Sequence, residues 1–130
     1  MIEILTPAQV DRARRTGALV ADILATLRGR SQVGTNLLEL DRWTAEMIRD
    51  AGAESCYVDY APSFGRGPFG RYVCTAVNDA VLHGRPRDQR LADGDLLAFL
   101  LEPLRNAGVD DRLAHFGNDD VSGHVTAFCR

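Results

Sequence analysis

Apolar residues near the N-terminus recur at steps of three and four, which is typical of a helix with one buried face. This stripe consists of Val10, Ala13, Gly17, Val20, Leu24 and Leu27. The preceding Thr6-Pro7-Ala8-Gln9 has the sequence of a capped helix start, with Pro7 at the first helical position and Gln9 completing a capping box with Thr6. The pattern predicts a helix that begins at Pro7 and ends near Gly29.

A second amphipathic segment predicts a second helix. Its start is placed at Thr35, and its end at Ala51-Gly52, where glycine suits a left-handed C-cap. The apolar face of this helix consists of Leu37, Leu40, Thr44, Met47 and Ile48. Trp43 lies on the same segment and is expected to pack against the core.

After Ala53 the pattern changes to short runs of aromatic and β-branched residues, which favour strands. Strands are predicted at residues 55–60, 71–77, 80–82 and 96–101, with a further strand at 109–116. Residues 61–70 are rich in turn formers and predict an exposed loop, and Asp93-Gly94-Asp95 predicts a turn. The run 96–101 is apolar on both faces, as expected of a central strand. Two helices followed by strands predict an α+β fold, with both helices packed on one side of an antiparallel sheet.

Composition narrows the class of protein. The chain has 130 residues, of which 45% are hydrophobic and 25% charged, as in a soluble globular domain. A net charge of −3 does not favour nucleic acid or an anionic membrane as a partner, and the N-terminus does not resemble a signal peptide. Cys56, Cys74 and Cys129 show no CxxC spacing, which favours free thiols and a cytoplasmic location.

The most informative segment is 72–86, which reads Tyr-Val-Cys-Thr-Ala-Val-Asn-Asp-Ala-Val-Leu-His-Gly-Arg-Pro and is followed by Asp93-Gly94-Asp95. Together with the chain opening, the second helix start and Gly52-Ala53, it resembles the N-terminal half of type I methionine aminopeptidases. The resemblance covers residues 1–116 and leaves 117–130 as a divergent or truncated tail. It implies half of a pita-bread fold, in which helices cover antiparallel strands.

The resemblance also implies a site. In the family, a His of the His-Gly motif faces the substrate, so His83 is the candidate catalytic residue. Two divalent metal ions (Mn, Co, Fe or Zn) are held in the family by two Asp, one His and two Glu. The first Asp lies five residues after the Asp-Gly-Asp turn, where this chain has Leu100, and the second corresponds to Asp111. The His and both Glu belong to the C-terminal half of the family fold, beyond residues 1–130.

Each candidate residue also has a structural interpretation. His83 is alternatively a loop histidine with a local hydrogen bond, and Asp111 is equally a remnant metal ligand or a carboxylate at the end of a strand. Cys74 is expected in the core rather than at a substrate pocket, and Asn78 is expected to shape a turn. His115, His124 and Cys129 match no common zinc spacing and are expected at the surface.

Three hypotheses follow from the loss of a metal ligand at Leu100. The first is a methionine aminopeptidase-like protein that is inactive alone and binds N-terminal Met peptides or a partner. The second is a metal-dependent aminopeptidase whose missing ligands come from a homodimer partner or another chain. The third is a truncated or frame-shifted gene remnant. An exposed half-fold face also predicts self-association.

Overall fold

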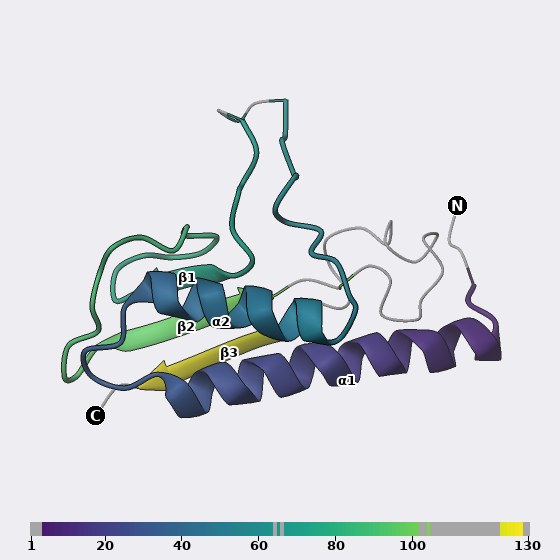
Figure 1. Ribbon diagram of the computed structural model, residues 1–130, viewed down its shortest axis with the longest axis horizontal. Helices are drawn as coiled ribbons and strands as arrows, with labels where there is room; N and C mark the ends of the chain where they lie inside the picture. Colours follow the sequence, from purple (N-terminus) through teal and green to yellow (C-terminus); the bar gives the residue numbers. More distant parts are fainter. Residues whose placement is uncertain (1–3, 64, 66, 102–103, 105–122, 129–130) are drawn as a thin grey trace.

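The computed structural model describes residues 4–63, 65, 67–101, 104 and 123–128 (Figure 1). The described elements are α1 (Pro7–Arg30), α2 (Leu37–Asp50), β1 (Cys74–Val77), β2 (Leu96–Leu101) and β3 (Gly123–Phe128). The three strands form one antiparallel sheet in the order β1-β2-β3. Because both helices share a hydrophobic core with this sheet, the predicted α+β fold is confirmed.

Helix α1 begins as its sequence predicts. The Gln9 backbone N–H donates to the Thr6 hydroxyl at 3.4 Å, and the Thr6 N–H donates to Gln9 Oε1 at 2.7 Å. This capping box satisfies two of the amides that a helix leaves unpaired at its first turn. The helix ends at Arg30, where Ser31 caps it by donating its hydroxyl to the Leu27 carbonyl at 2.7 Å.

Helix α2 starts one residue later than predicted. Its N-cap is Asn36 rather than Thr35, because Asn36 Oδ1 accepts the Leu38 N–H at 3.0 Å. Glu39 completes a capping box by accepting the Asn36 N–H at 2.9 Å. At the other end Gly52 adopts a φ of +66°, the left-handed conformation predicted for the helix exit.

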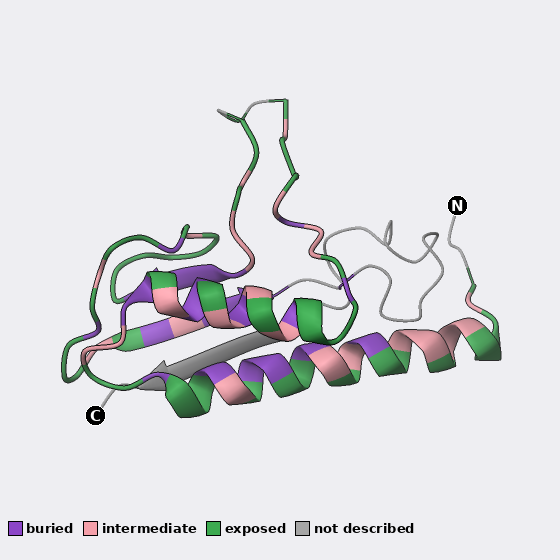
Figure 2. Cartoon of the chain, in the orientation of Figure 1, coloured by how far each residue is buried: buried purple, intermediate pink, exposed green. Residues whose placement is uncertain are grey.

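The two faces of the sheet are packed differently. On one face Leu97, Phe99 and Leu101 are fully buried between β2 and the helices. Figure 2 shows this core as buried positions on β1, on β2 and along both helices. The opposite face holds a smaller cluster, in which Cys74 and Leu100 pack with Tyr57. A strand that is apolar on both faces was predicted for β2, and the second cluster explains why both faces need to be apolar.

Two predicted strands are wrong. Residues 55–60 form a turn, since the Tyr60 N–H donates to the Tyr57 carbonyl at 3.0 Å, and they open the irregular loop that rises from the sheet in Figure 1. Residues 80–82 are an exposed loop, because the chain turns sharply at Asn78, whose φ is +56°. Local β propensity was outweighed in both segments by turn formation.

Strand β3 was not predicted, and it lies within the segment 117–130 that was expected to be a divergent tail. The strand predicted at 109–116 lies outside the described residues. The backbone of β3 pairs along the whole of β2, so residues 123–128 belong to the same sheet as β1 and β2.

Candidate functional site

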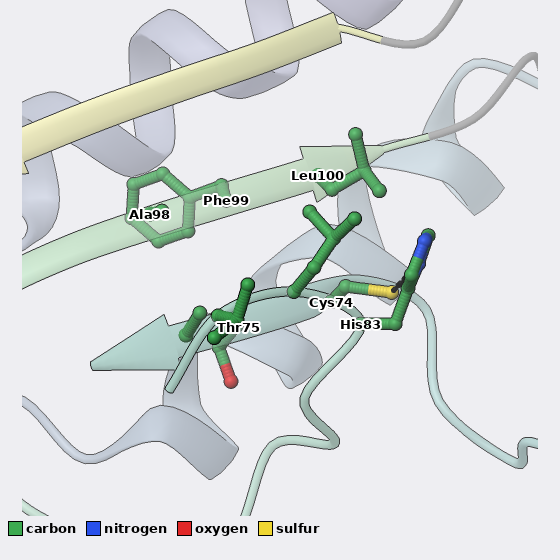
Figure 3. Close-up of a pocket in the computed structure, with 9 residues that line it drawn as sticks. Cys74, Thr75, His83, Ala98, Phe99 and Leu100 are labelled. Carbon is green, nitrogen blue, oxygen red and sulfur yellow. Dashed lines mark hydrogen bonds between the residues drawn. The ribbon is translucent and has the colours of Figure 1, made fainter. Parts of the chain in front are cut away.

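A shallow depression, open to solvent, lies on the sheet face turned away from the helices (Figure 3). β1, β2 and the loop after β1 line it with Cys74, Thr75, Ala76, Val81, Leu82, His83, Ala98, Phe99 and Leu100. Its enclosed part holds only about 10 Å³, which is room for about one water molecule, so a ligand would lie against this depression rather than inside it.

The turn after β1 directs the chain back over the depression. Asn78 donates from its backbone N–H to the Leu96 carbonyl at 2.9 Å and accepts the Leu96 N–H on Oδ1 at 3.0 Å. Its amide also donates to Asp95 Oδ1 at 2.8 Å. Asparagine tolerates the left-handed backbone found here, so the predicted structural role of Asn78 is confirmed. The Ala92 N–H and the Asn78 amide lower the pKa of Asp95.

Gly84 brings the loop against β1. The Thr75 N–H donates to the Gly84 carbonyl at 2.8 Å, so residue 84 runs along the outer edge of that strand. A Cβ at position 84 would collide with the Thr75 carbonyl, which leaves glycine as the residue that fits. The close approach fixes the position of the preceding residue, His83, at the rim of the depression.

His83, the candidate catalytic residue, is one of the residues that line the depression. Its Nδ1 is 4.0 Å from the Cys74 sulfur, a long thiol–imidazole contact whose donor depends on the tautomer (Figure 3). The residue has a φ of +54° and is exposed. Cys74 is 2% exposed and belongs to the smaller core cluster, so the expected core position is confirmed, although the residue also lines the depression.

Leu100 lines the depression at the position where the resemblance implies a metal ligand. It pairs with Cys74 in the sheet, is 9% exposed, and packs with Cys74 and Tyr57. Metal ligands bind through N, O or S atoms at about 2.0–2.6 Å, and leucine has none of these atoms in its side chain. The residues described at this position therefore do not fit the dinuclear metal centre that the resemblance implies.

The second expected ligand, Asp111, lies outside the described residues. Within the described part of the chain, no group of three or more His, Cys, Asp or Glu residues is arranged to hold a metal ion. The backbone register places His124 of β3 opposite Leu100, in one cross-strand row with Cys74. His124 was expected at the surface from its spacing alone, and this position on β3, opposite the central strand β2, was not predicted.

Sequence reasoning missed the aromatic residues that cover one side of the site. The Tyr57 and Phe69 rings lie 5.4 Å apart and are tilted by 46°. Tyr57 is buried and Phe69 is half-buried against the cluster that includes Leu100. The segment containing Phe69 was expected to be an exposed loop. One feature of the sequence could have indicated them. Both faces of β2 are apolar, so side chains from another part of the chain must pack on the face that the helices do not cover.

Asp41 of α2 ties the other end of this loop to the core. Its carboxylate accepts the Tyr72 N–H at 2.7 Å and lies 3.7 Å from an Arg71 guanidinium nitrogen. Burial raises the pKa of Asp41, and the Tyr72 N–H and the Arg71 charge act in the opposite direction. The contact holds the start of the motif strand next to α2.

None of the helices in the described part of the chain is long and apolar enough to cross a membrane.

The arrangement of the described elements matches one half of a known fold. A methionine aminopeptidase structure from streptococci superposes with a TM-score of 0.81 at 18% identity, covering 100% of this chain and 52% of that one. The methionine aminopeptidase of Rickettsia prowazekii superposes with a TM-score of 0.70 at 26% identity, covering 78% of this chain and 38% of that one. The fold is therefore the N-terminal half of a methionine aminopeptidase-type α+β fold.

Sequence comparison identifies the family. The model of metallopeptidase family M24 matches residues 11–106, and the chain belongs to that family. Methionine aminopeptidase B of Synechocystis is 33% identical over 132 residues, which cover 98% of this chain and 45% of that protein. Methionine aminopeptidase of Mycoplasma capricolum is 33% identical over 99 residues, covering 76% of this chain and 37% of that protein. The chain thus spans less than half the length of these two relatives.

Proposed function

We propose that this chain is a methionine aminopeptidase-like protein that binds peptides or a protein partner at the depression and does not cleave peptides on its own. The observation that carries the proposal is Leu100, an apolar side chain in the wall of the depression, where the resemblance implies a metal ligand. A buried leucine removes a charged donor and adds apolar surface, which disfavours a divalent ion nearby.

The remaining chemistry of the depression suits binding better than hydrolysis. Val81, Leu82 and Ala98 provide apolar contact surface, and the exposed His83 imidazole provides a polar group at the rim. An apolar surface with few polar groups is the usual composition of a ligand site. An N-terminal Met peptide is the ligand that family membership favours, with its apolar side chain against the exposed apolar residues of the depression and His83 near its amide.

The test is release of methionine from a Met-Ala-Ser peptide by the purified chain with Mn²⁺ or Co²⁺, compared with a chelator and with His83→Ala. We expect no release from protein that circular dichroism shows to be folded, and we expect the C-terminally amidated peptide to shift NMR signals of residues around His83. Release that both the chelator and His83→Ala abolish would overturn the inactive assignment. Absence of any NMR shift would overturn peptide binding.

The exposed apolar residues favour a second candidate function. Val81 is 90% exposed, Leu82 54% and Leu96 36%, and Val81 and Leu82 line the depression. A second chain that covers these residues would complete a metal-dependent aminopeptidase by supplying the missing ligands. In that case methionine release would rise more steeply than linearly with protein concentration, or would appear only after a partner chain is added.

A further inference from the structure

Arg85, two residues after His83, packs on an aromatic ring that contacts the cluster of Tyr57, Cys74 and Leu100. Its guanidinium carbon lies 5.7 Å from the centre of the Phe69 ring, which is a cation–π distance. One of its terminal nitrogens lies so close to Gly70 that a Cβ there would be 3.3 Å from it. The guanidinium is therefore positioned by contacts that do not use its N–H groups.

The other arginines nearby have oxygen partners on the protein. Arg71 lies 3.7 Å from the Asp41 carboxylate. Arg87 donates to Gln89 Oε1 at 2.8 Å, and Arg90 donates to the Gly34 carbonyl at 2.8 Å. Among the residues that the structure describes, Arg85 has neither a carboxylate within 4.0 Å nor a hydrogen-bond acceptor. It is a positioned cation whose donors remain available.

Contacts connect this cation to the candidate site. Phe69, on which Arg85 lies, packs against the cluster of Tyr57, Cys74 and Leu100. Cys74 and Leu100 also line the depression. Arg85 is thus connected through one aromatic ring to residues that line the depression, and it follows the lining residue His83 by two positions.

We propose that Arg85 is a specificity-determining residue that recognises a carboxylate on the bound peptide. A guanidinium donates two parallel N–H bonds to a carboxylate, and an aromatic ring behind it keeps the geometry without competing for those donors. The favoured ligand is a peptide with an apolar first residue followed closely by a carboxylate, either an acidic side chain or the C-terminus of a short peptide. This inference rests on the proposed peptide binding.

The experiment measures dissociation constants by NMR titration of the intact chain at low ionic strength. Three peptides are compared: amidated Met-Ala-Ala-Ser, amidated Met-Glu-Ala-Ser, and Met-Ala-Ala-Ser with a free C-terminus. We expect the peptides that carry a carboxylate to bind about threefold to tenfold more tightly than the neutral peptide, as for an exposed ion pair with good geometry. The two charged peptides distinguish a side-chain carboxylate from a terminal one.

Arg85→Gln should abolish this preference and leave the affinity for the neutral peptide unchanged. Arg87→Gln is the matched control, because it removes the same charge from the same loop at a side chain that contacts Gln89. Equal binding of all three peptides to the unaltered chain would overturn the role of Arg85 and leave peptide binding intact. Loss of the preference in Arg87→Gln as well would also overturn it, since general charge would then be the cause. Failure of every peptide to bind would instead reject the proposed function itself.

Discussion

Asp41 is a buried acid whose role is structural rather than chemical. Its side chain is 10% exposed and accepts the backbone N–H of Tyr72 at 2.7 Å, with the Arg71 guanidinium 3.7 Å away. Burying a charge is unfavourable unless hydrogen bonds and an opposite charge offset the loss of water. Because Asp41 lies on α2 and Tyr72 lies two residues before β1, the contact couples the helix layer to the start of a strand that lines the candidate site.

Two replacements of Asp41 distinguish the contribution of its hydrogen bond to stability from the contribution of its charge. Asp41→Ala leaves the Tyr72 N–H without its acceptor, and we expect a loss of about 1–3 kcal/mol in the free energy of unfolding. Asp41→Asn keeps an acceptor oxygen and removes the buried charge, so its loss should be smaller. Urea unfolding of both variants, with exposed Asp50→Ala as a control, measures the difference. Equal losses for Asp41→Ala and the control would show that the contact contributes nothing.

Asp95 makes the stability of the chain depend on pH in the acid range. Its pKa is lowered in the folded state from 3.8, because the Ala92 N–H and the Asn78 amide bind the charged form. The stabilisation is therefore fully present above about pH 4 and is lost as the pH falls through the lowered pKa. We expect Asp95→Asn to lose less stability than the unaltered chain between about pH 6 and pH 3. Urea unfolding at both pH values, with Asp93→Asn as the control, tests this, and parallel losses would contradict it.

At the scale of elements, the approach of residue 84 to β1 defines the shape of the site. Gly84→Ala would place a methyl group against the Thr75 carbonyl and force the loop away from the strand. We expect a loss of about 1–3 kcal/mol in unfolding free energy, together with weaker peptide binding because His83 moves with the loop. Thermal unfolding and peptide titration measure the two effects. A stable variant with unchanged affinity would show that the loop does not depend on this contact.

Gly17 provides the matched glycine control. It lies within α1, and nothing lies within 4 Å of the Cβ that alanine would add. Alanine has less backbone freedom than glycine in the unfolded chain, so Gly17→Ala should stabilise the fold by about 0.5–1 kcal/mol. The opposite signs expected at the two glycines separate a steric effect from the general effect of glycine replacement.

The elements that sequence reasoning identified are those specified by local residues. The cap of α1 and the glycine exit of α2 depend on hydrogen bonds between near neighbours, and the structure contains both. Residues 55–60 and 80–82 were predicted as strands from propensity, but neither has a strand partner in the described sheet. Strand pairing is a long-range interaction, and single-sequence patterns do not contain it.

At the scale of the whole molecule, the candidate site was predicted only in part. The His-Gly motif located His83 at the depression, and counting from Asp95 identified Leu100 as a residue of the site wall. The cover provided by Tyr57 and Phe69, and the position of Arg85 on the Phe69 ring, depend on contacts between separate loops. No local sequence pattern specifies such contacts, so the packing of Tyr57, Phe69 and Arg85 could not be predicted from the sequence.

The exposed apolar residues of the depression should make the chain self-associate. Val81 is 90% and Leu82 54% exposed, and burying each against a second copy would contribute about 1.5–3 kcal/mol. We therefore expect a dimer by size-exclusion chromatography with light scattering, and at least about tenfold weaker association in the double variant Val81→Ser, Leu82→Ser. Val33→Ser is the control, because Val33 is 48% exposed in the connection between α1 and α2, away from the residues that line the depression. A monomer at every concentration, or equal weakening by the control, would mean that these residues are not an interface between copies of the chain.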